Sequence, residues 1–302
     1  LCVPALANES TLGIVESTDE QGRVTRTIQR TARVLADSEN NFDEIKQVLL
    51  SLGMSQAAVD GLSEERLADY ENALEIQSVV EYTKTDEDGN VTYLSEVDAL
   101  NEVAAVEASR GAISDTYMRM SHTAANRGNA NYTFTTDATW LTMPEFRGTD
   151  SVGSCAMNCT VTPGTQSGSY SYLHRIYNTA GSFIRQETLS GNFSAIHDAS
   201  NGNFFGSGAT FSLPADRYLS SQGIPLDLYS QYNASFTYNG HVNLPNQESY
   251  FNSTGTYCHA RVTLSFSPSL SISTSGNSGS IGISAAISKD TKDVLKECHY
   301  IP

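Results

Sequence analysis

The sequence contains no long apolar run, and it has few basic residues. No window of its 302 residues holds the roughly 18 consecutive apolar residues that a transmembrane helix requires. Lys and Arg number 18 against 34 Asp and Glu, which gives a formal net charge of −16. Recognition of nucleic acid phosphates requires basic side chains gathered on one face. The sequence therefore predicts neither a transmembrane helix nor a nucleic-acid partner.

Charged residues of both signs are scarce in the second part of the chain. Residues 1–125 contain 23 Asp and Glu against 9 Lys and Arg, a formal −14, so residues 126–302 carry only −2. Hydrophobic residues make up 39% and charged residues 17% of the chain, a balance typical of a folded protein with an uncharged polar surface. A chain of 302 residues can bury two cores. We therefore expect two domains that differ in charge.

The first seven residues resemble the end of an export signal. Residues 1–7 are apolar and end in Ala5-Leu6-Ala7, and polar Asn8 follows. This is the arrangement around a signal-peptidase site at the end of an apolar region. We expect cleavage after Ala7 and a mature protein that is secreted or held at the cell surface.

Cysteine is rare, and its positions lead to a prediction of disulfides. Removal of Cys2 with the signal leaves four cysteines, Cys155, Cys159, Cys258 and Cys298. An even number in an exported chain favours disulfide pairs, in one of three connectivities. Of these we favour Cys258 with Cys298 and Cys155 with Cys159.

The same cysteines raise the alternative of a metal site. His259 follows Cys258 and His299 follows Cys298, so a mixed set of Cys and His ligands is available. Adjacent residues on a strand point to opposite faces, so only one member of each Cys-His pair can reach a common ion. We therefore predict no metal site.

Residues 8–125 carry the signals of an acidic helical domain. Apolar residues recur at helical spacing over residues 24–35 and 41–52, and Ser55 and Ser63 are placed to cap two further helices. Ser95 with Asp98 forms a capping box for another helix. Alternation on both sides of a polar turn predicts a short β-hairpin over residues 78–94.

Residues 130–302 have the pattern of an antiparallel β-sandwich. Short alternating runs, for example over 170–177 and 204–213, are separated by clusters of Gly, Pro, Asn and Ser. The predicted fold class is therefore α+β, a small helical N-terminal domain with a hairpin followed by a β-sandwich. Tyr170 and Tyr172 are candidates for stacking on sugar rings, although tyrosines on a strand face more often serve packing.

The clearest single pattern is a β-hairpin over residues 261–289. Leu270 and Ile272 on one arm, and Ile281 and Ile283 on the other, alternate with Ser, Gly and Ala. A two-residue turn at Gly276-Asn277 pairs Ile272 with Ile281 and Leu270 with Ile283, and it pairs Phe266 with Ile287. The same alternation suits a strand pair that packs on a core and one that enters a membrane.

One short motif bears on catalysis. The five residues 276–280 are similar to the nucleophile loop of trypsin-like serine proteases, and His122 precedes them in the order of that family. The same five residues form the predicted hairpin tip, and no carboxylate is placed to complete a triad. We predict no catalytic residue and no cofactor.

These features predict an exported, non-enzymatic protein that binds a protein or a surface glycan through its β domain. Two alternatives remain open. One is a membrane-acting β-pore-forming protein that uses the hairpin 261–289, and the other is a secreted hydrolase whose residues the sequence does not reveal.

Overall fold

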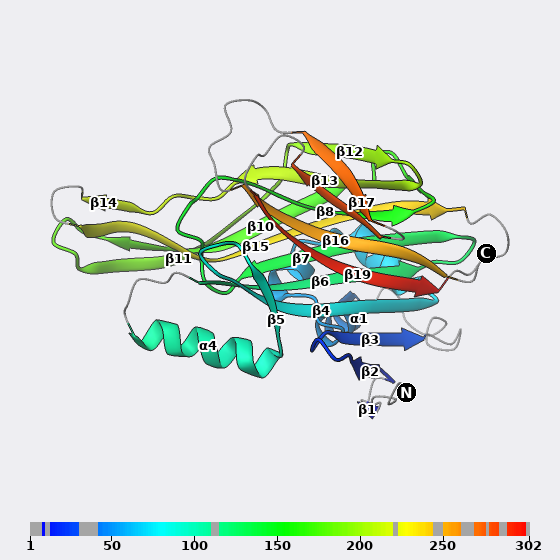
Figure 1. Ribbon diagram of the computed structural model, residues 1–302, viewed down its shortest axis with the longest axis horizontal. Coiled ribbons are helices and arrows are strands. Elements are labelled where there is room, and N and C mark those ends of the chain that lie inside the picture. Colours follow the sequence, from blue (N-terminus) through cyan, green and yellow to red (C-terminus); the bar gives the residue numbers. More distant parts are fainter. Residues whose placement is uncertain are drawn as a thin grey trace.

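The computed structural model describes residues 8–9, 13–29, 42–109, 115–219, 223–243, 250–260, 269–275, 278–283 and 289–299. Over these residues the chain forms 19 strands in three antiparallel sheets, and four helices (Figure 1). We call the sheets A, B and C. Beta structure therefore dominates both halves of the chain.

Sheet A is the largest and runs through most of the chain. Its neighbouring strands follow the order β1 (Asn8–Glu9), β2 (Val15–Thr18), β3 (Val24–Gln29), β4 (Glu75–Thr85), β6 (Thr116–Asn126), β7 (Asn131–Trp140), β15 (Ile224–Val242), β10 (Ser167–Tyr177) and β11 (Phe183–Asn192). Three short strands pair beside this path, β5 (Val91–Leu94) with β4, and both β9 (Cys159–Val161) and β14 (Arg217–Leu219) with β15.

Sheets B and C lie on one side of sheet A. Sheet B has the order β12 (Ile196–Asn201), β13 (Phe204–Ser212), β8 (Thr149–Met157), β16 (Tyr250–Ala260) and β19 (Lys289–His299). Sheet C is the hairpin of β17 (Leu270–Ser275) and β18 (Ser278–Ile283). Ile272 and Ile281 of sheet C pack with Cys155 and Phe204 of sheet B, so sheet C covers the outer face of sheet B.

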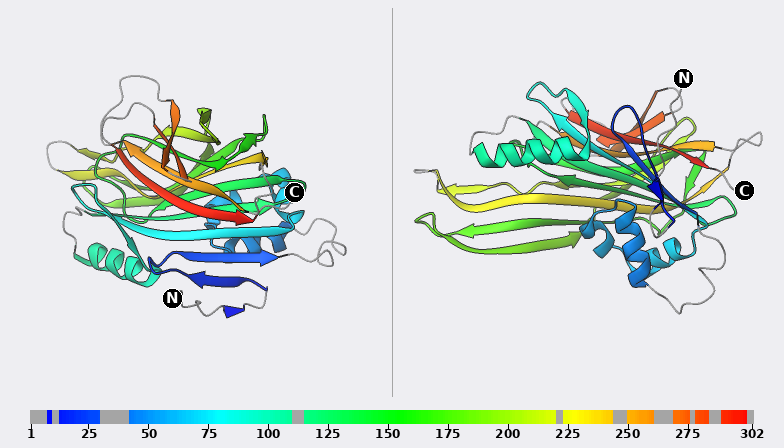
Figure 2. Two further views of the ribbon diagram at one scale, coloured as in Figure 1. Left: turned by 45° about the vertical axis from the view of Figure 1, so that its right-hand side comes forward. Right: turned by 90° about the horizontal axis from the view of Figure 1, so that it is seen from below.

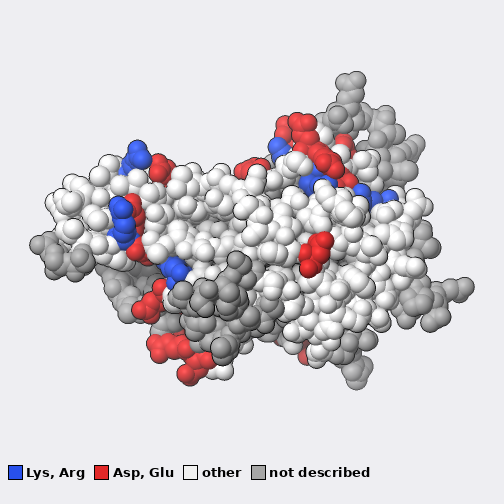
Figure 3. Space-filling model, turned by 90° about the horizontal axis from the view of Figure 1, so that it is seen from above, with Lys and Arg blue, Asp and Glu red and all other residues white. Residues whose placement is uncertain are grey.

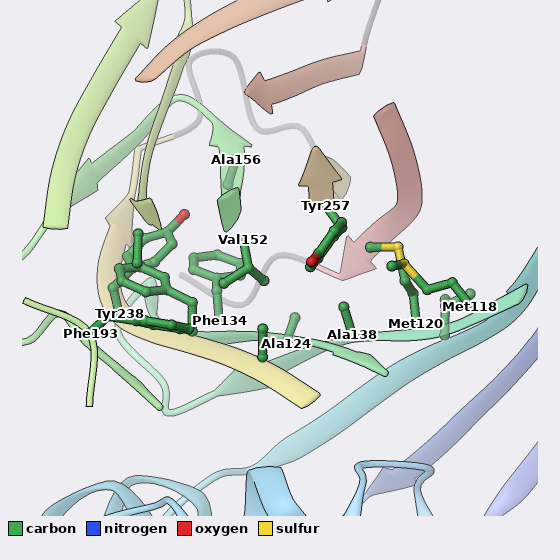
Figure 4. Packing of buried hydrophobic residues seen from close by; sticks show 14 of the residues in the cluster. Met118, Met120, Ala124, Phe134, Ala138, Val152, Ala156, Phe193, Tyr238 and Tyr257 are labelled. Carbon is green, nitrogen blue, oxygen red and sulfur yellow. The ribbon is translucent and has the colours of Figure 1, made fainter. Parts of the chain in front are cut away.

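The main core fills the space between sheets A and B. Along β7 and β15 every second residue points into it, including Phe134, Ala138 and Phe236. Figure 4 shows Phe134 and Ala138 pointing towards Val152 and Tyr257 of sheet B. The period of two in these strands follows from the pleat, which sends successive side chains to opposite faces.

Three helices cover the other face of sheet A. They are α1 (Phe42–Ser51), α2 (Gln56–Asp60) and α3 (Glu64–Glu71), and their apolar faces pack on Ile28, Ile76 and Ala125 (Figure 2). The hydroxyl oxygens of Ser55 and Ser63 accept hydrogen bonds from the backbone at the starts of α2 and α3, as their predicted capping role requires.

The fourth helix, α4 (Glu96–Ser109), packs on β4 and β5 through Ala99. Ser95 and Asp98 form the predicted capping interaction, in which the Asp98 backbone N–H donates to the Ser95 hydroxyl oxygen at 3.1 Å. In the part of the chain that the structure describes, no helix combines the length and the apolar character needed to span a membrane.

The predicted fold class is wrong. Most of the predicted helices exist, and so does the hairpin within 78–94, where Tyr82 pairs with Leu94. However, β3, β4 and β6 from the first 126 residues join β7 in one continuous sheet. There is thus no small helical domain that precedes a sandwich, since the helices are a layer on sheet A. The predicted helix 24–35 begins as strand β3, whose Val, Thr and Ile residues favour strand over helix.

The prediction of disulfides is also wrong for the described residues, which contain none. Cys258 lies opposite Thr291, whereas Cys298 lies opposite Phe251. Thr291 and Cys298 are seven residues apart on β19, so Cys258 and Cys298 are separated by roughly 23 Å along the strands. A disulfide requires Cα atoms within approximately 7 Å of each other. Cys155 belongs to the cluster between sheets B and C, and Cys159 to the main core, because the chain turns at Asn158 with a φ of 51°.

The register predicted for the hairpin is confirmed where it is described. Ile272 lies opposite Ile281 and Leu270 opposite Ile283. The predicted pair Phe266–Ile287 lies outside the described residues.

One end of the molecule is an extension of sheet A. β10, β11, β14 and the first part of β15 run beyond the end of sheet B, at the left of Figure 1 and in the right-hand view of Figure 2. The face of sheet A that points into the core elsewhere is therefore less covered here. Tyr172 and Tyr229 on this face are half-buried, whereas Phe236 and Tyr238 further along β15 are fully buried.

Candidate functional site

An aromatic pocket lies where the core between sheets A and B reaches the extension. Its volume is about 310 Å³. Tyr170 and Tyr172, the two candidates for stacking on sugar rings, line it from β10. The remaining lining residues come from β11, β13, β15 and the loops that follow β11 and β13: Asn192, Phe193, Ser194, Thr210, Phe211, Ser212, Pro214 and Tyr232.

The rings in this pocket are nearly parallel to one another. The centroids of Tyr170 and Tyr172 are 6.0 Å apart, with an angle of 8° between the ring planes. Tyr232 lies 6.1 Å from Tyr170 and 5.6 Å from Tyr172, again within 10° of parallel. Phe211 continues the set at 5.6 Å from Tyr232. The pocket thus has a wall of parallel aromatic rings.

The pocket lining is uncharged at neutral pH. None of its lining residues is Asp, Glu, Lys, Arg or His. Burial raises the pKa of Tyr172 and of Tyr232, so both phenols stay protonated. Around the rings, Asn192, Ser194 and Thr210 supply amide and hydroxyl groups. Aromatic surface with a few neutral polar groups suits a neutral ligand that has both apolar faces and hydroxyls.

A second pocket, of about 270 Å³, lies on the helix side of sheet A. It is lined by residues of α2, β10 and β15 and shares Asn192 and Phe193 with the aromatic pocket. Its lining has one aromatic residue, Phe193, so it lacks the wall of rings.

A charged cluster lies on the extension beyond the aromatic pocket. His174 Nε2 is 2.8 Å from an Asp227 oxygen, and His174 Nδ1 is 3.2 Å from a Glu187 oxygen. Arg217 Nε is 2.7 Å from Asp227, and Arg185 is 3.3 Å from Glu187. Figure 3 shows basic and acidic side chains side by side on this part of the molecule. Each carboxylate thus has a cationic partner in addition to His174.

This cluster bears on the hydrolase alternative, because glycoside hydrolysis uses two carboxylates. Glu187 and Asp227 are both bonded to the same imidazole and to separate arginines. A pair that acts as acid and nucleophile needs one carboxyl held protonated in an apolar setting. Neither carboxyl lies in an apolar setting, since each is bonded to an arginine, so the arrangement is that of a structural ion network.

A second titratable cluster is closed to solvent. Asp150 is fully buried between sheets A and B and accepts hydrogen bonds from the Tyr257 hydroxyl and, at 2.7 Å, from His259 Nδ1. Trp140 Nε1 donates to the Tyr257 oxygen at 2.9 Å. Burial raises the pKa of Asp150. With no exposed surface, Asp150 links β8 to β16 within sheet B, and the Trp140–Tyr257 hydrogen bond connects this group to sheet A.

The structure does not bring the protease-like residues together. His122 is buried between the sheets, where its ring nitrogens lie 3.1 Å from Thr136 Oγ1 and 3.0 Å from Ser253 Oγ. Gly279 of the five-residue motif lies on the outer side of sheet B, beside Phe204. Sheet B therefore separates them. Among the described residues, no group of three or more His, Cys, Asp or Glu is arranged to hold a metal ion.

Sequence reasoning found two of the pocket aromatics and missed three. Tyr170 and Tyr172 are adjacent on one strand face, a pattern visible in sequence. Phe193, Phe211 and Tyr232 come from other strands and meet them only through the order β15-β10-β11 of sheet A and the packing of β13. No local signal in the sequence gives that strand order.

Comparisons with known proteins add no identification. No family model matches the chain, and no curated protein matches it. One solved structure, described as "AvmM Catalyzes Macrocyclization in Alchivemycin A Biosynthesis", is 8% identical and covers 57% of this chain and 80% of its own. Its TM-score is 0.25, too low for the likeness to carry an argument about fold or function.

Proposed function

We propose that the protein is an exported, non-enzymatic binding protein that recognises a neutral carbohydrate through the aromatic pocket. The observation that carries this proposal is the wall of parallel rings with hydroxyl and amide groups beside it. A sugar ring has an apolar C–H face and a rim of hydroxyls, so it matches both parts of this lining. Support for export comes from the apolar residues that end at Ala7.

Carbohydrate binding fits the pocket better than binding of an anion or a cation. A phosphate or carboxylate would need basic side chains in the lining, and a cation would need acidic ones. The pocket has neither. A protein partner would contact a wider surface than a pocket of about 310 Å³ provides.

The test is a glycan array followed by calorimetry with the sugars that bind. Tyr172→Ala removes one ring of the wall, so it should weaken binding about two- to tenfold. Tyr250→Ala is the matched control, because Tyr250 is 54% exposed and lies on β16 outside the pocket. Equal weakening by both variants, or binding of no sugar, would refute the proposal. Sugar released from a bound oligosaccharide would favour the hydrolase alternative.

A second function, insertion of the hairpin into a membrane, is favoured by one observation. Sheet C pairs with neither of the larger sheets and contacts sheet B through side chains such as Ile272 and Ile281. One face of the hairpin carries Leu270, Ile272, Ile281 and Ile283, and the other is built from Ser and Gly. Release of β17 and β18 therefore breaks no strand ladder of sheet B, and an alternating strand pair suits a lipid–water boundary.

A disulfide that ties the hairpin to sheet B tests this second function. A Cβ built at Gly279 lies 2.9 Å from Cγ of Phe204. Cysteines at these two positions therefore come close to the roughly 3.5–4.5 Å between Cβ atoms that a disulfide needs. If the hairpin inserts, the Phe204→Cys/Gly279→Cys variant should release dye from liposomes only after reduction. Equal release in the oxidised and reduced forms, or none from the unmodified protein, counts against insertion.

A further inference from the structure

The rings of the aromatic pocket belong to a longer row that leaves the pocket and follows the extension. Successive ring centroids in this row are 4.5–5.6 Å apart. Its members, in order from the body outwards, are Phe193, Phe211, Tyr232, Tyr172, Tyr229 and His174. We call this set the aromatic row. It is contributed by the β11–β12 loop and three strands, β13, β15 and β10.

A break in the strand pairing places Tyr229 in this row. On one side Ser171 lies opposite Asn233, and on the other Leu173 lies opposite Ser230. One residue of β10, Tyr172, therefore faces two of β15, Gln231 and Tyr232, which is a β-bulge. In a regular strand, residues three apart point to opposite faces. The bulge brings Tyr229 and Tyr232 to the same face.

At this bulge, Gln231 adopts an unfavourable backbone conformation. Its φ is 53°, a left-handed value that non-glycine residues rarely adopt. Its side chain is exposed, so the residue is not held there by burial. Strained backbone of this kind is often kept where it positions a functional side chain. Here its consequence is the extension of the aromatic row from Tyr232 to Tyr229 and His174.

We propose that the ligand is a linear oligosaccharide that lies along the aromatic row, with one end in the pocket and further sugar units over Tyr229 and His174. This inference rests on the proposed carbohydrate binding. Tyr172 and Tyr229 are half-buried, so part of each ring is open to a ligand that leaves the pocket along the extension. Burial raises the pKa of Tyr229 as well, so its hydroxyl remains a neutral hydrogen-bonding group.

The outer end of the row also has a defined limit. Beyond His174, the next residue on the same face of β10 is Ile176, which lies opposite Asp227. The ring series therefore ends at His174, whose two ring nitrogens are already bonded to Asp227 and Glu187 of the ion network. Binding should therefore strengthen with each added unit until the row is filled, and then level off.

The experiment measures affinity against chain length. Linear homo-oligosaccharides of a sugar that binds, from the monosaccharide to the hexasaccharide, are titrated into the full chain by calorimetry. We expect affinity to rise about two- to tenfold for each unit that reaches a further ring, and then to reach a plateau. Tyr229→Ala should remove the gain of the longer chains and leave the monosaccharide unchanged, whereas Tyr172→Ala should weaken all lengths.

Two controls separate ring contact from a change in fold. Tyr229→Phe keeps the ring and should keep the gain with length, and Tyr250→Ala should behave as the unmodified protein. If sugars bind with the same affinity at every length, or if Tyr229→Ala weakens the monosaccharide as much as the hexasaccharide, the extended site is refuted while the pocket stands. If no sugar binds, the proposed function itself fails.

Discussion

Strand β15 belongs to two regions of the molecule that differ in what covers them. From Tyr232 to Val242 one face lies against sheet B and the other is buried on the helix side. From Ile224 to Ser230 the strand is part of the extension, and most of its residues are half-buried. Aromatic residues point to the same face in both parts. This aromatic face of β15 is therefore part of the main core where sheet B covers it, and part of the candidate site where sheet B ends.

The largest difference between the two regions should appear in stability. Phe236→Ala removes a fully buried ring from the main core and should lower the free energy of unfolding by about 3–5 kcal/mol. Tyr229→Ala, in the uncovered part of the same strand, should cost only about 1 kcal/mol. Urea unfolding of both variants measures this. Similar losses would mean that the extension is as tightly packed as the core.

A smaller loss is expected where the helical layer joins the covered region. Asp137 is buried on β7 and accepts hydrogen bonds from the Ser55 backbone N–H at 2.8 Å and from Asn233 Nδ2 at 2.6 Å. It also lies 3.2 Å from Arg119. Asp137→Asn keeps the shape but replaces an accepting oxygen by a donor, so it should cost about 1.5–3 kcal/mol.

Hydrogen exchange gives the second readout for this variant. Asp137 is hydrogen-bonded to Ser55, the residue that caps the start of α2. Amide protection should therefore fall in α2 and should be unchanged in β10 and β11 of the extension. Asp150→Asn, an equally sized substitution at a buried carboxylate of sheet B, controls for the effect of a buried amide as such. Uniform loss of protection would contradict a local role for Asp137.

The comparison also explains what sequence alone could predict. Local signals were sufficient for the caps at Ser55, Ser63 and Ser95 and for the register of Ile272 with Ile281, because each depends on residues close in the chain. The continuity of sheet A was missed. Its β6–β7 hairpin passes through residues 126–129, the boundary between the two predicted domains.

Small polar residues that line the helix side of sheet A have a packing role that composition alone does not reveal. On the helix side of sheet A the buried positions include Ser78, Thr123 and Thr135, and their hydroxyls bond to one another or to helix residues. A buried strand face made of Ser and Thr looks like a surface in sequence. The aromatic pocket was hidden for a different reason, since Phe211 and Tyr232 meet Tyr172 only after the strand order is fixed.

The bulge at Gln231 separates the two regions, and it provides a substitution with a gain. Gln231→Gly removes the cost of a left-handed conformation, about 1–2 kcal/mol for a residue with a Cβ, against about 0.5–1 kcal/mol of added chain entropy. The net effect should be a stabilisation of roughly 0.5–1 kcal/mol. Thermal unfolding measures it, and Ser230→Gly, at a neighbouring position with ordinary φ, should destabilise instead. A loss of stability in Gln231→Gly would show that its side chain, and not the backbone, maintains the bulge.

The smallest expected change in stability concerns the packing of α4 on β4, and this change depends on pH. Glu102 on α4 accepts a hydrogen bond from the Tyr117 hydroxyl at 2.7 Å and lies 3.0 Å from Lys84 Nζ. The Tyr117 hydrogen bond, followed by that from Lys84, lowers the pKa of Glu102 from its ordinary value of 4.5. A carboxyl whose pKa is lower in the folded state stabilises the fold above its unfolded pKa, and this contribution is lost as the pH falls through the folded pKa.

Glu102→Gln should therefore reduce stability at neutral pH and have little effect in acid. Because the Glu102 side chain is 40% exposed, solvent screens the interaction and the loss should be only about 0.2–1 kcal/mol. Urea midpoints of the variant and the unmodified protein, measured at steps from about pH 7 down to below about pH 4, should converge as Glu102 becomes protonated. Asp88→Asn removes a charge from the exposed turn between β4 and β5 and serves as the control for net charge. If the two variants give the same pH profile, net charge and not the contact with Tyr117 and Lys84 determines the effect, and the cover provided by α4 depends on its apolar contact through Ala99.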